Sequence, residues 1–183
     1  MQQANAIIYQ SKIIIPSSGD VDSLLQDGYG HKIENGYLAL DPCEVLYLVE
    51  KNRLAVIDEK ERQILSFQNI LSRELISNMM LWTKYIIYRD LRGRGFVVKH
   101  SMRNGVCFSI YERGNYPKKA PSYELYVVAE GISVTLGHLK EVLDEVKNFG
   151  RMLKLAVIDR RGEIVYYSLD RIELNILGDE NIE

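Results

Sequence analysis

The chain has 183 residues, of which 46% are hydrophobic and 26% are charged, as in an ordinary globular protein. Its formal net charge of -2 argues against nucleic-acid binding through bulk positive charge, but leaves room for a local basic patch. No apolar run approaches the ~20 residues that cross a bilayer. Gln, Asn and Lys interrupt the first fifteen residues, so we expect a cytoplasmic protein with no secretory leader and no membrane partner.

Cysteine and histidine are too scattered to form a recognisable metal site. Cys43 and Cys107 lie far apart, and His31, His100 and His138 show no ligand spacing. We therefore expect two reduced, partly buried thiols, no metal ion and no cofactor.

The first half of the chain alternates short strands and helices. The clearest signal is a helix start, in which Asp41 is the N-cap, Pro42 takes the first helical position and Glu44 completes a capping box. We predict strands over 5–15, 37–40 and 53–57, and helices over 21–27, 42–52 and from Ser66. A longer helix is predicted over about 75–91, with a core face of Met79, Leu81, Trp82, Tyr85, Ile86 and Tyr88.

The second half is richer in strands. The pattern predicts one amphipathic helix over about 135–149. It predicts strands over 96–99, 106–111, 123–129, 153–158, 164–169 and 171–177. The chain is therefore predicted to form two α/β halves that meet within 85–95.

Several segments in the second half are similar to the tRNA-splicing endonuclease family of archaea and eukaryotes. They are 88–105, 107–114 and 153–174, and the first includes Tyr88, Asp90, Leu91, Arg92, Gly95 and Phe96. Gly28-Tyr29-Gly30 and 38–56 resemble the family's N-terminal domain more weakly. The resemblance implies an α/β (α+β) fold with a small mixed N-terminal domain over 1–88. A restriction-endonuclease-like C-terminal domain with a central mixed sheet would follow over 89–183.

The resemblance also implies a metal-independent RNA cleavage by a Tyr, a His and a Lys, which yields 2′,3′-cyclic phosphate and 5′-hydroxyl ends. Tyr111 matches the tyrosine. The histidine position falls on Lys119, Pro121 or Tyr123, depending on a small insertion, and 116–128 contains no histidine. Eight residues before Asp159, the lysine position holds Arg151, which cannot exchange protons.

Loss of the general acid predicts a non-catalytic, structural subunit of a heterotetrameric enzyme, because general acids contribute ~10²–10⁴-fold in rate. Its expected partners are a catalytic subunit of the same family and precursor tRNA. Two alternatives stay open. One is an active endonuclease that uses Tyr111, Lys119 and Arg151, and the other is a repurposed RNA-binding module.

Three surfaces are candidates for binding. Arg92, Arg94, Lys99 and Lys119 could contact tRNA phosphates, or form a solvated charged face. An acidic turn is expected to dock into a partner through Asp159 and Glu163, although Arg160 and Arg161 oppose that pattern and a plain turn is the alternative. The C-terminal strands are expected to form a homodimer seam, unless they face the chain's own core, through Val165, Tyr167, Leu169, Ile172 and Leu174.

Overall fold

The computed structural model describes residues 3–9, 12–16, 19–58, 60, 63–76 and 78–172. Its N-terminal part forms a six-stranded mixed sheet in the order β3-β4-β2-β1-β5-β6. The strands are β1 (Ala4–Tyr9), β2 (Lys12–Ile15), β3 (His31–Lys32), β4 (Leu38–Leu40), β5 (Leu54–Asp58) and β6 (Gln63–Leu65). The helical elements are α1 (Gly19–Gln26), the 3-10 helix η1 (Glu34–Gly36), α2 (Pro42–Glu50) and α3 (Phe67–Leu75).

The C-terminal part forms a five-stranded mixed sheet in the order β11-β10-β9-β8-β7. Its strands are β7 (Val97–His100), β8 (Phe108–Tyr111), β9 (Tyr123–Ala129), β10 (Met152–Ile158) and β11 (Ile164–Leu169). Strands β9 and β10 are parallel, and helix α5 (Leu136–Asn148) makes the crossover that a parallel pair requires. The predicted mixed α/β fold with a central mixed C-terminal sheet is confirmed.

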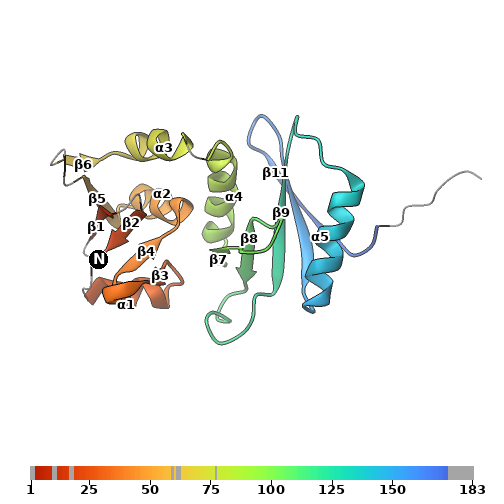
Figure 1. Cartoon of the computed structure of the whole chain (residues 1–183), viewed down its shortest axis with the longest axis horizontal. Coiled ribbons are helices and arrows are strands. Elements are labelled where there is room, and N and C mark those ends of the chain that lie inside the picture. Colours follow the sequence, from red (N-terminus) through yellow and green to blue (C-terminus); the bar gives the residue numbers. More distant parts are fainter. Residues whose placement is uncertain are drawn as a thin grey trace, which may run out of the picture.

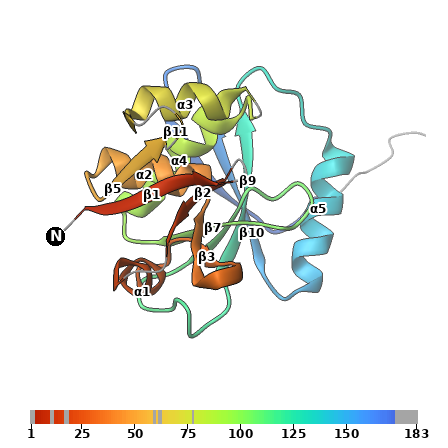
Figure 2. The same cartoon turned by 60° about the vertical axis from the view of Figure 1, so that its left-hand side comes forward.

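Helix α4 (Leu81–Gly93) lies between the two sheets, as Figures 1 and 2 show, whereas α5 covers the far side of the C-terminal sheet. The side chains of Tyr85, Ile87, Tyr88 and Leu91 are all buried. One apolar core includes these residues and extends from the N-terminal sheet to the C-terminal sheet. The expected boundary between residues 88 and 89 falls inside α4 and stays a prediction.

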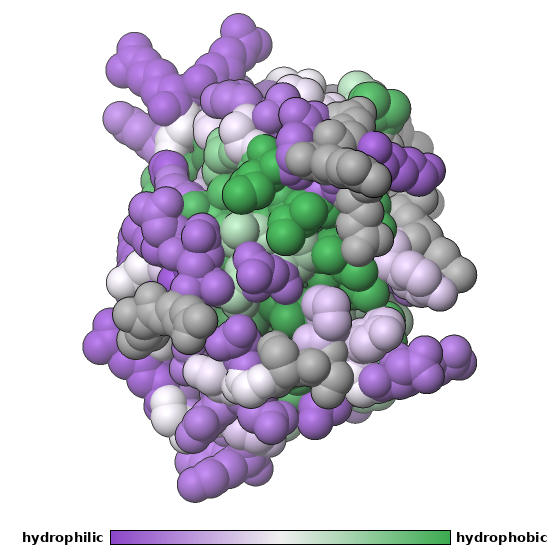
Figure 3. Space-filling view, turned by 90° about the vertical axis from the view of Figure 1, so that its left-hand side faces the viewer, coloured by the Kyte–Doolittle hydropathy of each residue, from purple (hydrophilic) through white to green (hydrophobic). Residues whose placement is uncertain are grey.

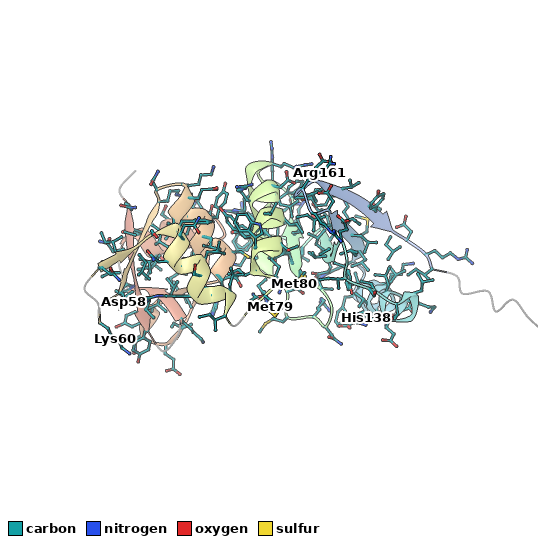
Figure 4. The ribbon with its side chains drawn as sticks, turned by 90° about the horizontal axis from the view of Figure 1, so that it is seen from above. Asp58, Lys60, Met79, Met80, His138 and Arg161 are labelled. Carbon is teal, nitrogen blue, oxygen red and sulfur yellow. The ribbon has the colours of Figure 1, made fainter. Side chains whose placement is uncertain are left out.

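The single helix predicted over about 75–91 is wrong at its start. The structure ends α3 at Leu75 and begins α4 at Leu81. Met79, which was expected on the core face, is 89% exposed in the connection between the two helices, where Figure 4 labels it. Ser and Asn favour non-helical turns because their side chains compete for backbone hydrogen bonds, and Leu81 N donates to the carbonyl of Asn78 in this connection.

The predicted helix start at Asp41 is confirmed. Its side chain accepts a hydrogen bond from Cys43 N, and the side chain of Glu44 accepts one from Asp41 N, which completes the capping box. The last predicted strand, 171–177, is wrong in its described part, because Arg171 and Ile172 are not in a strand. Residues 173–177 lie outside the described residues.

The outer face of the N-terminal sheet carries a row of isoleucines. Strand pairing places Ile14 opposite Ile7, Ile7 opposite Ile57 and Ile57 opposite Ile64. Each of these isoleucines has a neighbour along its strand that belongs to the core on the inner face, such as Ala6, Ile13, Val56 and Leu65, so alternation puts this row on the outer face. Figure 3 shows hydrophobic residues gathered at the centre of this side of the molecule.

Within the described ranges, no helix has the length and apolar character that crossing a membrane requires. Cys43 is buried and Cys107 is partly buried, and both are free thiols. The described part of the chain also contains no group of three His, Cys, Asp or Glu side chains placed to hold a metal ion.

Candidate functional site

Tyr111 ends strand β8 and shares one face of the C-terminal sheet with Ser109, because residues two apart on a strand point the same way. On the neighbouring strand β9, Glu124 pairs with Ser109 and Tyr123 pairs with Ile110. Paired residues project from the same face. Glu124 therefore lies on the Tyr111 face, and Tyr123 lies on the opposite face.

Arg151 reaches this face from the end of helix α5. Gly150 has φ of 67°, a left-handed conformation that ends the helix and turns the chain into β10. Arg151 Nη1 then forms an ion pair with Glu124 Oε1. Glu124 is 0% exposed. A buried carboxylate needs charged or hydrogen-bonding partners. Arg151 therefore neutralises Glu124 inside the protein.

Two further side chains complete the surroundings of Glu124. Arg103 Nε lies 3.3 Å from the same oxygen, Oε1, and Ser109 Oγ donates to Oε2 at 2.6 Å. The Arg103 guanidinium carbon lies 3.8 Å from the centroid of the Phe149 ring, which helps to hold it in place. We call Glu124, Arg103, Ser109 and Arg151 the Glu124 cluster.

The environment of Tyr111 does not favour ionisation. Burial raises the pKa of Tyr111, the nearby Tyr116 adds to the rise, and the opposing charge of Arg151 is a smaller effect. The Tyr111 and Tyr116 ring centroids lie 5.1 Å apart in an edge-to-face contact. A general base must lose its proton near the working pH, so this tyrosine stays neutral at pH about 7.

Among the described residues, no hydrogen bond joins the Tyr111 hydroxyl to a side chain at the three candidate acid positions. Lys119 is exposed in the loop 112–122, and Pro121 is partly buried there. Tyr123 is buried on the other face of the sheet, with its ring centroid 6.2 Å from that of Phe96 and 4.2 Å from Lys154 Nζ.

The three histidines lie elsewhere. His31 and His100 line a cavity of about 550 Å³ at the domain junction. His138 lies on α5, with its ring 6.0 Å from that of Tyr126 (centroid to centroid), and Figure 4 places it on the opposite edge of the C-terminal domain from Arg161. Within the described ranges, no hydrogen bond connects Tyr111 to any of the three histidines.

Lys99, an expected RNA contact, joins the two domains. Its ammonium group donates to Gly28 O at 3.2 Å, to Gly30 O at 2.8 Å and to Glu44 Oε1 at 2.9 Å. An ammonium group has three donors, so these acceptors use its full capacity. Glu44 Oε2 also accepts from Gly30 N at 2.9 Å. Lys99 is thus left without a donor for a phosphate.

Arg92 also binds across the junction. Its guanidinium carbon lies 4.0 Å from the centroid of the Tyr29 ring, and Nη2 donates to Asp27 O at 3.1 Å. Arg94, one turn from Asp90, forms an exposed ion pair with that carboxylate at 3.0 Å. Of the four residues expected to bind RNA, Arg94 and Lys119 are the two most exposed, and their RNA contact stays a prediction.

The expected docking turn is internally bonded. Asp159 Oδ1 accepts from Arg161 N at 2.8 Å and from Glu163 N at 2.9 Å. The neighbouring Arg160 N donates to Glu130 Oε2 at 2.9 Å. Asp159 thus stabilises the turn itself. The side chain of Glu163 is exposed, so a partner could reach it. Its docking stays a prediction.

The expected dimer residues divide between exposed and inward positions. Strand β11 is an edge strand, and Val165 and Tyr167 on it are 49% and 53% exposed. Leu169 and Ile172 pack instead against the apolar cluster beneath α5. Leu174 lies outside the described residues. The dimer seam stays a prediction.

Sequence reasoning missed the carboxylate that pairs with Arg151. Glu124 was the available signal, since it is one charged residue within the apolar strand YELYVVA and so would need a counter-charge if buried. Neither Arg103 nor Ser109 gave a signal. Arg103 approaches Glu124 from the loop between β7 and β8, and Ser109 approaches it through the pairing of β8 with β9.

The chain has two parts, each built around its own sheet, and each part matches the model of a known domain family. A model of the "tRNA intron endonuclease, N-terminal domain" matches residues 5–71. A model of the "tRNA intron endonuclease, catalytic C-terminal domain" matches residues 81–166. The matched ranges therefore correspond to the two sheets and leave out the connection that contains Met79.

Whole-chain relatives agree with these matches. A "tRNA-splicing endonuclease" of Methanothermobacter thermautotrophicus is 30% identical over 145 residues, which are 79% of this chain and 82% of the relative. Proteins of the same name from Methanococcus vannielii (29% over 169 residues, 92% and 94%) and Pyrococcus furiosus (29% over 143 residues, 78% and 81%) are also similar. The chain belongs to the tRNA-splicing endonuclease family.

Proposed function

We propose that this chain is the structural, non-catalytic subunit of a tRNA-splicing endonuclease, which supports a separate catalytic subunit in cutting introns from precursor tRNA. The observation that carries the proposal is the ion pair between Arg151 and the buried Glu124. The family resemblance assigns a catalytic lysine to the position of Arg151. Here that cation neutralises an internal carboxylate instead of facing a phosphate.

The proton chemistry of the site supports the same proposal. Attack by a ribose 2′-hydroxyl needs a base, and departure of the 5′ oxygen needs an acid. The pKa of Tyr111 is raised by burial, which weakens it as a base near neutral pH. The acid position on β9 offers no imidazole, and Tyr123 faces away from Tyr111. The three expected roles are thus unfilled or altered.

What the chain retains suits a supporting subunit. Exposed Val165 and Tyr167 on the edge strand β11 are available for pairing with a second copy. Exposed Glu163 in the turn after β10 is available to meet a basic groove of the partner. Arg94 and Lys119 are exposed cations and could add salt-dependent contacts to precursor tRNA.

The test is cleavage of an intron-containing precursor tRNA by this chain alone, by a family member with an intact Tyr, His and Lys, and by the two mixed. We expect no cleavage by this chain alone and cleavage on mixing. Cleavage by this chain alone, with loss of activity in the Tyr111→Phe variant, would show that it is an active endonuclease and would overturn the proposal.

A further inference from the structure

The donors of the Glu124 cluster converge on one carboxylate. Arg103 Nε and Arg151 Nη1 bind the same oxygen, Oε1, and Ser109 Oγ binds the other at 2.6 Å. Two guanidinium groups and a hydroxyl that converge on a single anion are the donor set that proteins use for phosphate and carboxylate ligands. In this chain, the anion belongs to the protein itself.

The charges show why an anion is required there. The cluster contains two positive groups and one negative group, and the two arginine side chains are 19% and 22% exposed. Like charges this close repel strongly where water is largely excluded. Without Glu124, both guanidinium groups would lack a counter-charge, and an anion of similar size from solution would be attracted to the vacated space.

The Glu124 cluster lies on the sheet face that carries the candidate site. Ser109 and Glu124 lie on the same face as Tyr111, and Arg151 occupies the position that the resemblance assigns to the phosphate-facing lysine. Arg151 lowers the pKa of Tyr111 and Glu124 raises it, both less than burial does. The carboxylate therefore lies beside the surface where an RNA phosphate would meet a catalytic relative.

We propose that Glu124 is a resident anion, which fills a latent phosphate-type site between Arg103 and Arg151 and so closes this face to RNA phosphate. The proposal rests on the non-catalytic role proposed above and adds the residue that keeps the site closed. Removal of the carboxylate is expected to open a site for a small oxyanion, such as acetate or inorganic phosphate.

The test compares thermal unfolding of the wild type and the Glu124→Ala variant in chloride, acetate and phosphate at equal ionic strength. This substitution removes about one acetate from the cluster. We expect acetate or phosphate to raise the Tm of Glu124→Ala by about 5–10 °C at about 100 times Kd. The wild type and a matched control, Glu163→Ala at an exposed acid, should show no such response. Adding Arg103→Met to Glu124→Ala should abolish it.

Other outcomes are equally decisive. If Glu124→Ala folds only when acetate or phosphate is present, the proposal is supported; if it folds in none of the three salts, no external anion replaces the carboxylate and the proposal fails. An equal Tm response in Glu124→Ala and Glu163→Ala also overturns it.

A second measurement uses the intact wild type. Phosphate is added while the side-chain Nε–H resonances of Arg103 and Arg151 are followed by NMR. They should stay unchanged, and saturable shifts of both would show that Glu124 leaves the site open. Neither assay involves RNA or a partner, so a chain that cleaves precursor tRNA alone would refute the proposed function without deciding these results.

Discussion

The ammonium group of Lys99, on the C-terminal sheet, lies 2.9 Å from the carboxylate of Glu44, at the start of α2 in the N-terminal domain. The Glu44 side chain is 3% exposed and that of Lys99 is 21% exposed. Because Lys99 also binds the carbonyls of Gly28 and Gly30, one charged group joins the loop before β3, helix α2 and strand β7. The contact fixes the two domains relative to each other.

Replacing Lys99 by Met is therefore expected to lower the free energy of unfolding by about 3–5 kcal/mol, because it leaves the buried carboxylate of Glu44 without its counter-charge. Urea unfolding followed by circular dichroism measures this loss. Lys118→Met, at an exposed lysine, is the matched control and should change stability by less than about 0.5 kcal/mol. Equal effects of the two substitutions would show that Lys99 does not join the domains.

Helix α4 is tied to the C-terminal sheet by a second polar contact, in which the hydroxyl of Tyr166 donates to Asp90 Oδ2 at 2.7 Å. Tyr166→Phe should cost about 1.5–3 kcal/mol, as for hydrogen bonds to charged groups. Differential scanning calorimetry checks the loss. Tyr167→Phe, at the adjacent residue that is 53% exposed, should leave Tm unchanged. A similar drop in both variants would contradict the assigned role of the Tyr166 hydroxyl.

Tyr88 presents the opposite case. Its hydroxyl is buried in the shared core and has no hydrogen-bond partner among the described residues. An unpaired buried polar group costs free energy, so Tyr88→Phe should keep or raise the free energy of unfolding, by at most about 1 kcal/mol. Chemical denaturation measures it. A loss of more than about 1 kcal/mol would reveal a partner for this hydroxyl.

Stability is expected to fall at alkaline pH. Burial is the main cause that raises the pKa of Tyr29, Tyr88 and Tyr166 above the ordinary value. Above pH about 10, the unfolded chain releases these protons while the native state still holds them, so stability is full below that pH and falls as pH rises. Urea midpoints between pH about 8 and about 11 test this, and the fall should be smaller in Tyr166→Phe. Midpoints that stay constant or increase would contradict it.

Local signals in the sequence predicted much of the fold. The Asp41 N-cap, Pro42 and Glu44 fixed the start of α2 because capping depends on residues only three positions apart. Runs rich in aromatic and β-branched residues between turns likewise located β9 and β11. The break between α3 and α4 was missed, since an apolar Met79 fits helical spacing whether or not the chain is helical there.

The site could be predicted only in part. Matching the motifs assigned Tyr111 and Arg151 to one candidate site, and in the structure Arg151 binds Glu124 on the Tyr111 face. What each residue contacts depends on segments far apart in sequence. Arg151 pairs with Glu124, 27 positions away, and Lys99 with Glu44, 55 positions away. Spacing along the chain identifies a cation but does not show which carboxylate neutralises it.

The most direct test of a non-catalytic role is the single-turnover rate of precursor tRNA cleavage by the enzyme assembled from this chain and a catalytic partner. With Tyr111→Phe in this chain, we predict the wild-type rate, whereas the corresponding tyrosine-to-phenylalanine change in the partner should abolish cleavage. A rate loss of ~10²–10⁴-fold from Tyr111→Phe alone, the size expected for a lost proton-transfer group, would contradict the account.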